Sequence, residues 1–158
     1  MPFQMSTRGR YGVRLMVALA VNHGSGTSLL RDIARREGIS EKYLGQIVIP
    51  LKAARLVVSQ RGSHGGYSLA RAPEDITVRD VVEAIEGRIA PAPCAGEAAS
   101  DPGCVESPSA CERATSCVVV RVWKKLQEDI EGSLGSFTLA GLARQAREIE
   151  ESPTNYVI

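Results

Sequence analysis

The chain has 158 residues, 44% of them hydrophobic and 23% charged, which suffices for one ordinary domain with an additional arm. No apolar run reaches the length of a membrane-spanning helix, so we expect no membrane protein. Residues 1–80 carry twelve Lys and Arg against six Asp and Glu, and residues 81–158 carry seven against twelve. A basic first half suits a polyanion such as DNA, but ordinary surface charge gives the same count, so charge leaves both interpretations open.

The first residues lack the pattern of a signal peptide. Arg8, Arg10 and Arg14 are followed by only a short apolar run, without a cleavage site of small residues. We therefore expect a cytoplasmic protein. In that compartment clustered cysteines bind metal or sense redox state more often than they form stable disulfides.

Three helices are predicted in the first third of the chain. The first is capped by Ser6 or Thr7 and ends before a Gly-rich turn at residues 23–26. The second starts after the capping candidate Ser28 and stops at Gly38, and the third starts after Ser40. The last two helices with their tight turn are typical of a helix-turn-helix, although a plain helical hairpin has the same pattern.

The next segment favours DNA binding. Val57–Gln60 and Tyr67–Ala70 are predicted strands, joined by the six-residue connection RGSHGG. Its three glycines suit a hairpin that needs positive φ angles. A hairpin directly after a helix-turn-helix is the wing of a winged helix, and its tip would bring Arg61 and His64 to the DNA backbone or minor groove.

The second half begins with a helix capped by Thr77, which ends at Gly87. A loop rich in Pro, Ala and Gly follows, and from about Cys117 a helix carries an apolar seam at Val118, Val122, Leu126 and Ile130. Such a seam must be buried against something, and dimerisation is the economical solution. Thr138 caps a last helix.

The expected fold class is mostly α with a small β-hairpin: a winged helix-turn-helix domain plus a long dimerisation helix. We expect the DNA-binding domain at residues 1–87 and a cysteine-bearing sensor loop at residues 88–116. The dimerisation helix and the C-terminal helix are expected at residues 117–150, and a flexible tail at residues 151–158.

All four cysteines lie in or next to the loop, with the spacing C-x9-C-x6-C-x5-C. This spacing matches neither the knuckle of a structural zinc site nor a plant-type ferredoxin. Thiols that oxidise to a disulfide are the alternative to a metal site. The two histidines are not set beside a nucleophile, so no catalytic residues are predicted and we do not expect an enzyme.

Four segments together resemble the Rrf2 family of bacterial transcription regulators: STRGRYGVRLMVALA, ISEKYLGQI, RGSHGGYSLARAPEDIT and VVEAIEG. The resemblance runs from Ser6 to about Glu150. It implies a homodimeric winged-helix repressor of double-stranded DNA, whose loop before the dimerisation helix holds a [2Fe–2S] cluster in some members. Other members sense nitric oxide or regulate cysteine metabolism.

The resemblance also implies DNA-binding residues. Ser40, Tyr43 and Gln46 match the helix that faces base edges, and the wing residues Arg61, Gly65, Gly66 and Tyr67 match as well. We add Arg8, Arg10 and Lys42 as phosphate contacts. Iron–sulfur members often carry Glu where this chain has Gly45, so the base sequence read here is expected to differ.

By position, Cys94, Cys111 and Cys117 are similar to the three cluster ligands of the family. The fourth ligand departs from it, because the positions of the family's His and acidic ligands hold Val120 and Arg10. Cys104 is the substitute; alternatively it is a free thiol, and a partner's acid or water fills the site.

The tail supplies a rival interpretation. It ends in NYVI, and cysteine-metabolism regulators of the family similarly end in an aromatic-rich stretch finishing in Ile. The resemblance implies that Tyr156 and the carboxylate of Ile158 bind O-acetylserine sulfhydrylase, with the cysteines secondary. A frayed tail is the alternative.

Overall fold

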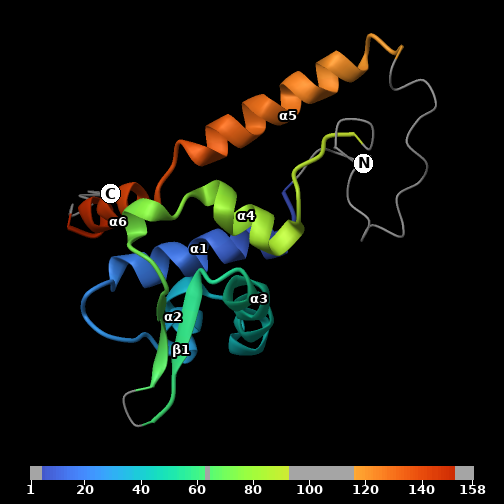
Figure 1. Ribbon diagram of the computed structural model, residues 1–158. Coiled ribbons are helices and arrows are strands. Elements are labelled where there is room, and N and C mark those ends of the chain that lie inside the picture. The colour runs from blue at the N-terminus through green and yellow to red at the C-terminus, as the bar shows by residue number, and fades with distance from the viewer. Residues whose placement is uncertain (1–4, 63–64, 93–115, 152–158) are drawn as a thin grey trace, which may run out of the picture.

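The computed structural model describes residues 5–62, 65–92 and 116–151. These ranges form α1 (Thr7–Val21), α2 (Leu30–Glu37), α3 (Glu41–Ala53), β1 (Val57–Gln60), β2 (Gly66–Leu69), a 3-10 turn (Pro73–Asp75), α4 (Val78–Glu86), α5 (Val120–Gly135) and α6 (Leu139–Glu151). The predicted fold class, mostly α with one small antiparallel hairpin, is confirmed (Figure 1). None of the described helices is long and apolar enough to cross a membrane.

Helix starts follow the capping side chains. Ser6, Ser40 and Thr138 each accept a hydrogen bond from the backbone N–H three residues later, which satisfies one of the free donors of a helix N-terminus. Thr77 and Asp80 form a reciprocal capping box at the start of α4. The predicted starts of α1, α3, α4 and α6 therefore rest on local side-chain hydrogen bonds.

The predicted cap of α2 is wrong. The residue before the helix is Leu29, which makes no side-chain cap. Ser28 instead exchanges two backbone hydrogen bonds with Tyr67, both of 2.8 Å, and so pairs with the outer edge of β2. The end of α2 is as predicted, because Gly38 adopts the left-handed conformation with φ of 65°.

The core is centred on α1, which packs against α3, α4 and α6. Gly12 allows the close approach of α1 and α4, since a Cβ at this position would collide with the side chain of Ile85. The largest fully buried side chains are Leu15, Met16, Leu44, Ile47, Leu51, Leu56, Ile76, Leu139, Val81 and Val82.

The C-terminal helix α6 joins this core although it is distant in sequence. Its residues Leu139 and Ala143 are buried, and Arg147 Nη2 donates a 2.7 Å hydrogen bond to the carbonyl oxygen of Val21 at the end of α1. We call α1–α4, the hairpin and α6 the head. The predicted unit 117–150 thus contains two helices with different surroundings, since α5 lies outside the head.

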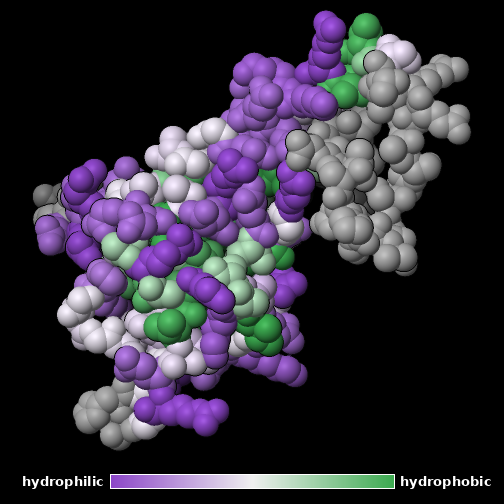
Figure 2. Space-filling model, in the orientation of Figure 1, coloured by the Kyte–Doolittle hydropathy of each residue, from purple (hydrophilic) through white to green (hydrophobic). Residues whose placement is uncertain are grey.

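We call α5 the arm. It lies over α4, and its N-terminal half extends beyond the head (Figure 1). Within the arm Val122 is 57% and Leu126 is 38% exposed, and Val118 just before it is 76% exposed, whereas Val120 is buried. Figure 2 shows hydrophobic surface at the outer end of the arm. The arm therefore keeps an apolar seam that this chain alone does not bury.

Candidate nucleic-acid interface and sensor segment

The exposed face of α3 carries a stripe of three side chains. Lys42, Gln46 and Ile49 are exposed and follow one another at helical spacing, whereas the opposite face packs into the core. The buried residues of α3 are Leu44, Ile47, Val48 and Leu51. Of the residues predicted to face DNA from this helix, Ser40, Lys42 and Gln46 are exposed.

Tyr43 has a different environment from the other predicted base contacts. Its half-buried ring packs edge-on against Tyr11, with 6.0 Å between ring centroids. Arg14 lies 5.6 Å above the Tyr11 ring and donates hydrogen bonds to the side chain and backbone carbonyl of Glu37. These contacts hold the start of α3 against α1 and α2, so much of the Tyr43 ring is used to position the helix.

The wing has the predicted hairpin, with β2 one residue earlier than expected. Gly66 has a φ of 150°, and a Cβ there would lie 2.7 Å from the Ser28 carbonyl oxygen. A Cβ at Gly65 would lie 2.7 Å from the Gln60 carbonyl oxygen. Both glycines are therefore required by the close backbone packing of the wing, and Tyr67 is held by its pairing with Ser28.

A groove separates the wing from α2 and α3. Three cations line it, Arg31 from α2, Lys52 from α3 and Arg61 from the wing, together with the carboxylate of Glu41. Lys52 Nζ also donates a 2.8 Å hydrogen bond to Ser59 Oγ, which ties the last turn of α3 to β1. The sequence interpretation missed Arg31 and Lys52, because their approach to the wing depends on tertiary packing.

Arg8 and Arg10 are exposed on the first turn of α1. Arg10 Nη2 donates a 3.1 Å hydrogen bond to Thr7 Oγ1. The contact between Tyr11 and Tyr43 places this end of α1 beside the start of α3, whereas the wing pairs with the segment that follows the other end of α1. Neither arginine lines the cationic groove.

Cys117 is the one predicted cluster ligand within the described residues. It is half-buried, carries a free thiol, and lies three residues before the first residue of the arm. The predictions at Cys94, Cys104, Cys111, His64, Tyr156 and Ile158 lie outside the described residues. In the part of the chain that the structure describes, no three His, Cys, Asp or Glu residues come together as a metal site.

Val120 and Arg10 stand at the two positions where the resemblance implies a fourth cluster ligand. Val120 is a hydrocarbon side chain that is only 9% exposed, and Arg10 is a cation bonded to Thr7. Neither can donate an electron pair to iron. Four thiolates form a donor set of the kind that holds iron–sulfur clusters, so the chemistry of the cysteines fits such a group.

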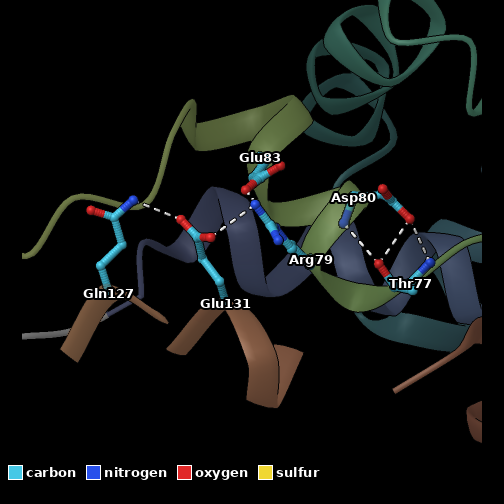
Figure 3. A network of polar contacts seen from close by, with 6 residues as sticks. All are labelled: Thr77, Arg79, Asp80, Glu83, Gln127 and Glu131. Carbon is cyan, nitrogen blue, oxygen red and sulfur yellow. Dashed lines mark hydrogen bonds and ion pairs between the residues drawn. The ribbon is translucent and has the colours of Figure 1, made fainter. Parts of the chain in front are cut away.

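A polar network joins the arm to α4 (Figure 3). Arg79 Nε donates a 2.8 Å hydrogen bond to Glu83, and Arg79 Nη2 lies 2.9 Å from the carboxylate of Glu131. Gln127 donates to Glu131 at 2.7 Å, while its own Oε1 is buried without a hydrogen-bond partner in the described residues. The hydrogen bond to Glu83 raises the pKa of Arg79 above its usual value. The guanidinium, which is charged at neutral pH as in any arginine, therefore links the arm to α4.

Comparison with known proteins shows one family. The family Rrf2, described as "Iron-dependent Transcriptional regulator", matches residues 5–145. The protein rrf2 of Nitratidesulfovibrio vulgaris is 36% identical over 143 residues, which are 90% of this chain and 89% of that protein. The HTH-type transcriptional regulator CymR of Bacillus subtilis is 36% identical over 154 residues, which are 98% and 99% of the two chains.

Solved structures agree with this assignment. The structure of CymR, the global cysteine regulator of B. subtilis, covers 90% of this chain and 98% of its own, with a TM-score of 0.69 and 36% identity. The structure of T. potens IscR covers 97% and 95%, with a TM-score of 0.72 and 35% identity. Both CymR comparisons are with proteins named as regulators. The chain belongs to the Rrf2 family, and it is a DNA-binding transcriptional regulator.

Proposed function

We propose that the chain is a homodimeric repressor that reads DNA with α3 and the wing and senses a signal through the segment between α4 and α5. The observation that carries this proposal is the cationic groove beside the exposed face of α3. Cations along a groove contact phosphates and fix the register of a protein on the duplex, while side chains on the adjacent helix reach base edges.

In this proposal the residues of the head have separate roles. Gln46 reads base edges in the major groove, with Ser40 and the outer edge of Tyr43 beside it. Lys42, Arg61, Arg8 and Arg10 contact phosphates. Gly65, Gly66 and Tyr67 shape the wing, for which their tight backbone packing is the support.

The second copy of the chain is proposed to cover the arm. Val122 and Leu126 lie one helical turn apart, and both are exposed. A seam of this kind is typical of helices that pair with each other. Two heads joined through their arms would bind two half-sites, which suits the symmetry of operator DNA.

We further propose that Cys94, Cys111 and Cys117 hold a [2Fe–2S] cluster, with Cys104 as the fourth ligand. The supporting observations are the four thiols, the free Cys117 next to the arm and the family description as an iron-dependent regulator. Such a group supplies reversible one-electron chemistry, and an all-thiolate ligand set gives a lower potential than one with histidine.

Cys117 and the network around Arg79 provide a route from the loop to the head. Cys117 lies three residues before the start of the arm, and Arg79 and Glu131 join the arm to α4. A change in the loop that displaces the arm would alter how the two heads are presented to DNA. The residues of this chain thereby couple ligand state to DNA affinity.

A second candidate function is a cluster-free regulator of sulfur metabolism. It is favoured by CymR, which is as similar as any relative named above and is titled a global cysteine regulator. Control would come from oxidation of the thiols, or from O-acetylserine sulfhydrylase bound through Tyr156 and Ile158.

Anaerobic purification separates the two candidates. The cluster proposal predicts a red-brown protein with about two irons and two sulfides per chain, and a Cys104→Ala variant that loses or weakens the absorbance. A colourless, iron-free protein would contradict the cluster and favour thiol chemistry or the tail. Pulldown of the sulfhydrylase by the wild type, abolished on removal of Ile158, would then identify the tail as the sensor.

A further inference from the structure

The side chain of Ile49 is 68% exposed, which makes it the most exposed large hydrophobic side chain among the described residues of segments 5–62 and 65–92. Single exposed hydrophobic residues are common on protein surfaces, so its position matters more than its exposure. Ile49 extends the stripe that begins with Lys42 and Gln46, on the face of α3 opposite the core.

The geometry of α3 places Ile49 next to a base-reading side chain. It lies three residues after Gln46, which corresponds to about 4.5 Å along the helix axis. Successive bases on one strand are about 3.4 Å apart, so a helix lying in the major groove would offer the two side chains to neighbouring base steps.

The side chain has properties suited to reading one particular group. The C5-methyl of thymine is the apolar group that base edges present in the major groove, and apolar side chains recognise it. Ile49 is β-branched and has essentially one rotamer in a helix, so little entropy is lost on contact. Pro50 follows it within α3; its ring fixes its own φ, and it has no N–H to donate to the carbonyl one turn earlier.

The surroundings favour DNA over a protein partner. The cationic side chains Lys42 and Lys52 lie on either side of Ile49 along α3, which suits a polyanion. The arm lies on the far side of α4 from α3 (Figure 1), so the proposed second copy would not cover Ile49.

We infer that Ile49 is a specificity-determining residue that contacts a thymine methyl group at the base step next to the one read by Gln46. The inference rests on the proposed reading of DNA by α3. It assigns to an apolar side chain a part of the sequence selectivity that charge and hydrogen bonding do not supply.

The test replaces single thymines by deoxyuridine, which removes the methyl group and leaves the base pair intact. A high-affinity duplex is first selected from a random library by the purified full-length protein. Binding of each substituted duplex is then measured by fluorescence anisotropy for the wild type, Ile49→Ala and Ile49→Val. Ile149→Ala is the matched control, because Ile149 is 74% exposed but lies on α6.

At one thymine per half-site, the wild type and Ile149→Ala should lose about fourfold in affinity, the effect of one buried methyl group. Ile49→Ala should bind the thymine duplex more weakly and no longer distinguish it from the deoxyuridine duplex, with Ile49→Val in between. The inference would be overturned if the wild type and Ile49→Ala distinguished the thymine duplex from the deoxyuridine duplex equally well, or if the wild type did not distinguish them. Either result would leave the proposed reading of DNA by α3 intact. Failure to select any sequence would overturn the DNA-reading proposal as well.

Discussion

The head and the arm use the same kinds of residue in opposite ways. In the head, Leu44 and Ile47 are fully buried, and their helix is held on both sides. In the arm, Val122 and Leu126 have a comparable helical spacing but remain exposed. The difference teaches that an apolar stripe indicates a need for a partner without saying which one. The head buries its own stripe, whereas the partner of the arm is proposed to be a second molecule.

The largest effect is expected from a charge in the arm's seam. Leu126→Glu should convert the dimer into a monomer, as measured by analytical ultracentrifugation, because a carboxylate cannot be buried between apolar seams. DNA affinity should fall roughly 100-fold or more, since loss of bivalency removes a factor of about 10²–10⁴. Lys124→Glu, on another face of the same helix, should remain a dimer. A dimeric Leu126→Glu protein would mean that this seam is not the interface.

The core of the head should be the next most sensitive region. Leu44→Ala should reduce the free energy of unfolding by about 2–5 kcal/mol, because the buried site cannot fully collapse around the smaller side chain. The exposed Val58 is 44% accessible, and Val58→Ala should change stability by less than about 0.5 kcal/mol. Urea unfolding of both variants measures the contrast, and similar losses would contradict the burial described for the head.

Glycines should also behave differently in the two regions. Gly66→Ala in the wing should cost about 1–3 kcal/mol, because the φ of 150° and the Ser28 carbonyl 2.7 Å away do not accommodate a Cβ. Gly132→Ala in the arm meets nothing within 4 Å, so it should stabilise the helix by up to about 1 kcal/mol. Thermal unfolding tests both the predicted loss and the predicted gain of stability. A Gly66→Ala variant as stable as the wild type would show that the wing accommodates a Cβ without cost.

The cationic groove predicts a smaller and more specific change. Arg61→Ala should lower the slope of log affinity against log salt by about 1, the effect of one lost phosphate contact, and weaken all sequences alike. Arg144→Ala, an exposed arginine of α6 outside the groove, serves as the control. If the two variants have the same slope, Arg61 does not contact phosphate.

The smallest effect is expected at the junction between head and arm. Arg79→Met should lower the melting temperature by a few degrees, because it leaves Glu131 without its partner on α4. Lys125→Met removes an ion pair with Asp129 that lies within the arm and is largely exposed, and it should have no measurable effect. Equal melting temperatures for both variants would show that the network does not hold the arm.

Local chemistry made much of the head predictable. The starts of four helices depend on a hydroxyl that bonds a backbone N–H three residues away, and such signals are visible in a short window of sequence. The cap of α2 failed for the opposite reason: Ser28 pairs with Tyr67, 39 positions later, and a window around Ser28 contains no trace of that contact.

The candidate site likewise contains residues that the sequence predicted and residues that only the tertiary structure revealed. The exposed face of α3 follows from helical periodicity, whereas Gln46 as a candidate base contact comes from the family resemblance, and Lys42 is added beside it as a candidate phosphate contact. Arg31 and Lys52 were missed, because only the packing of α2 and α3 beside the wing brings them to one groove. The pairing of Arg79 with Glu131 likewise joins two helices separated by the cysteine loop.

Selection of duplexes from a random library by the purified protein tests the central proposal most directly, since it asks whether paired heads read sequence. The proposed dimer predicts an enriched inverted repeat, because two symmetry-related heads place their α3 helices in successive major grooves about one helical turn apart. An enriched pool without a repeated half-site would contradict the pairing of the arms. A folded protein that enriches no sequence would contradict the reading of DNA by α3 and the wing.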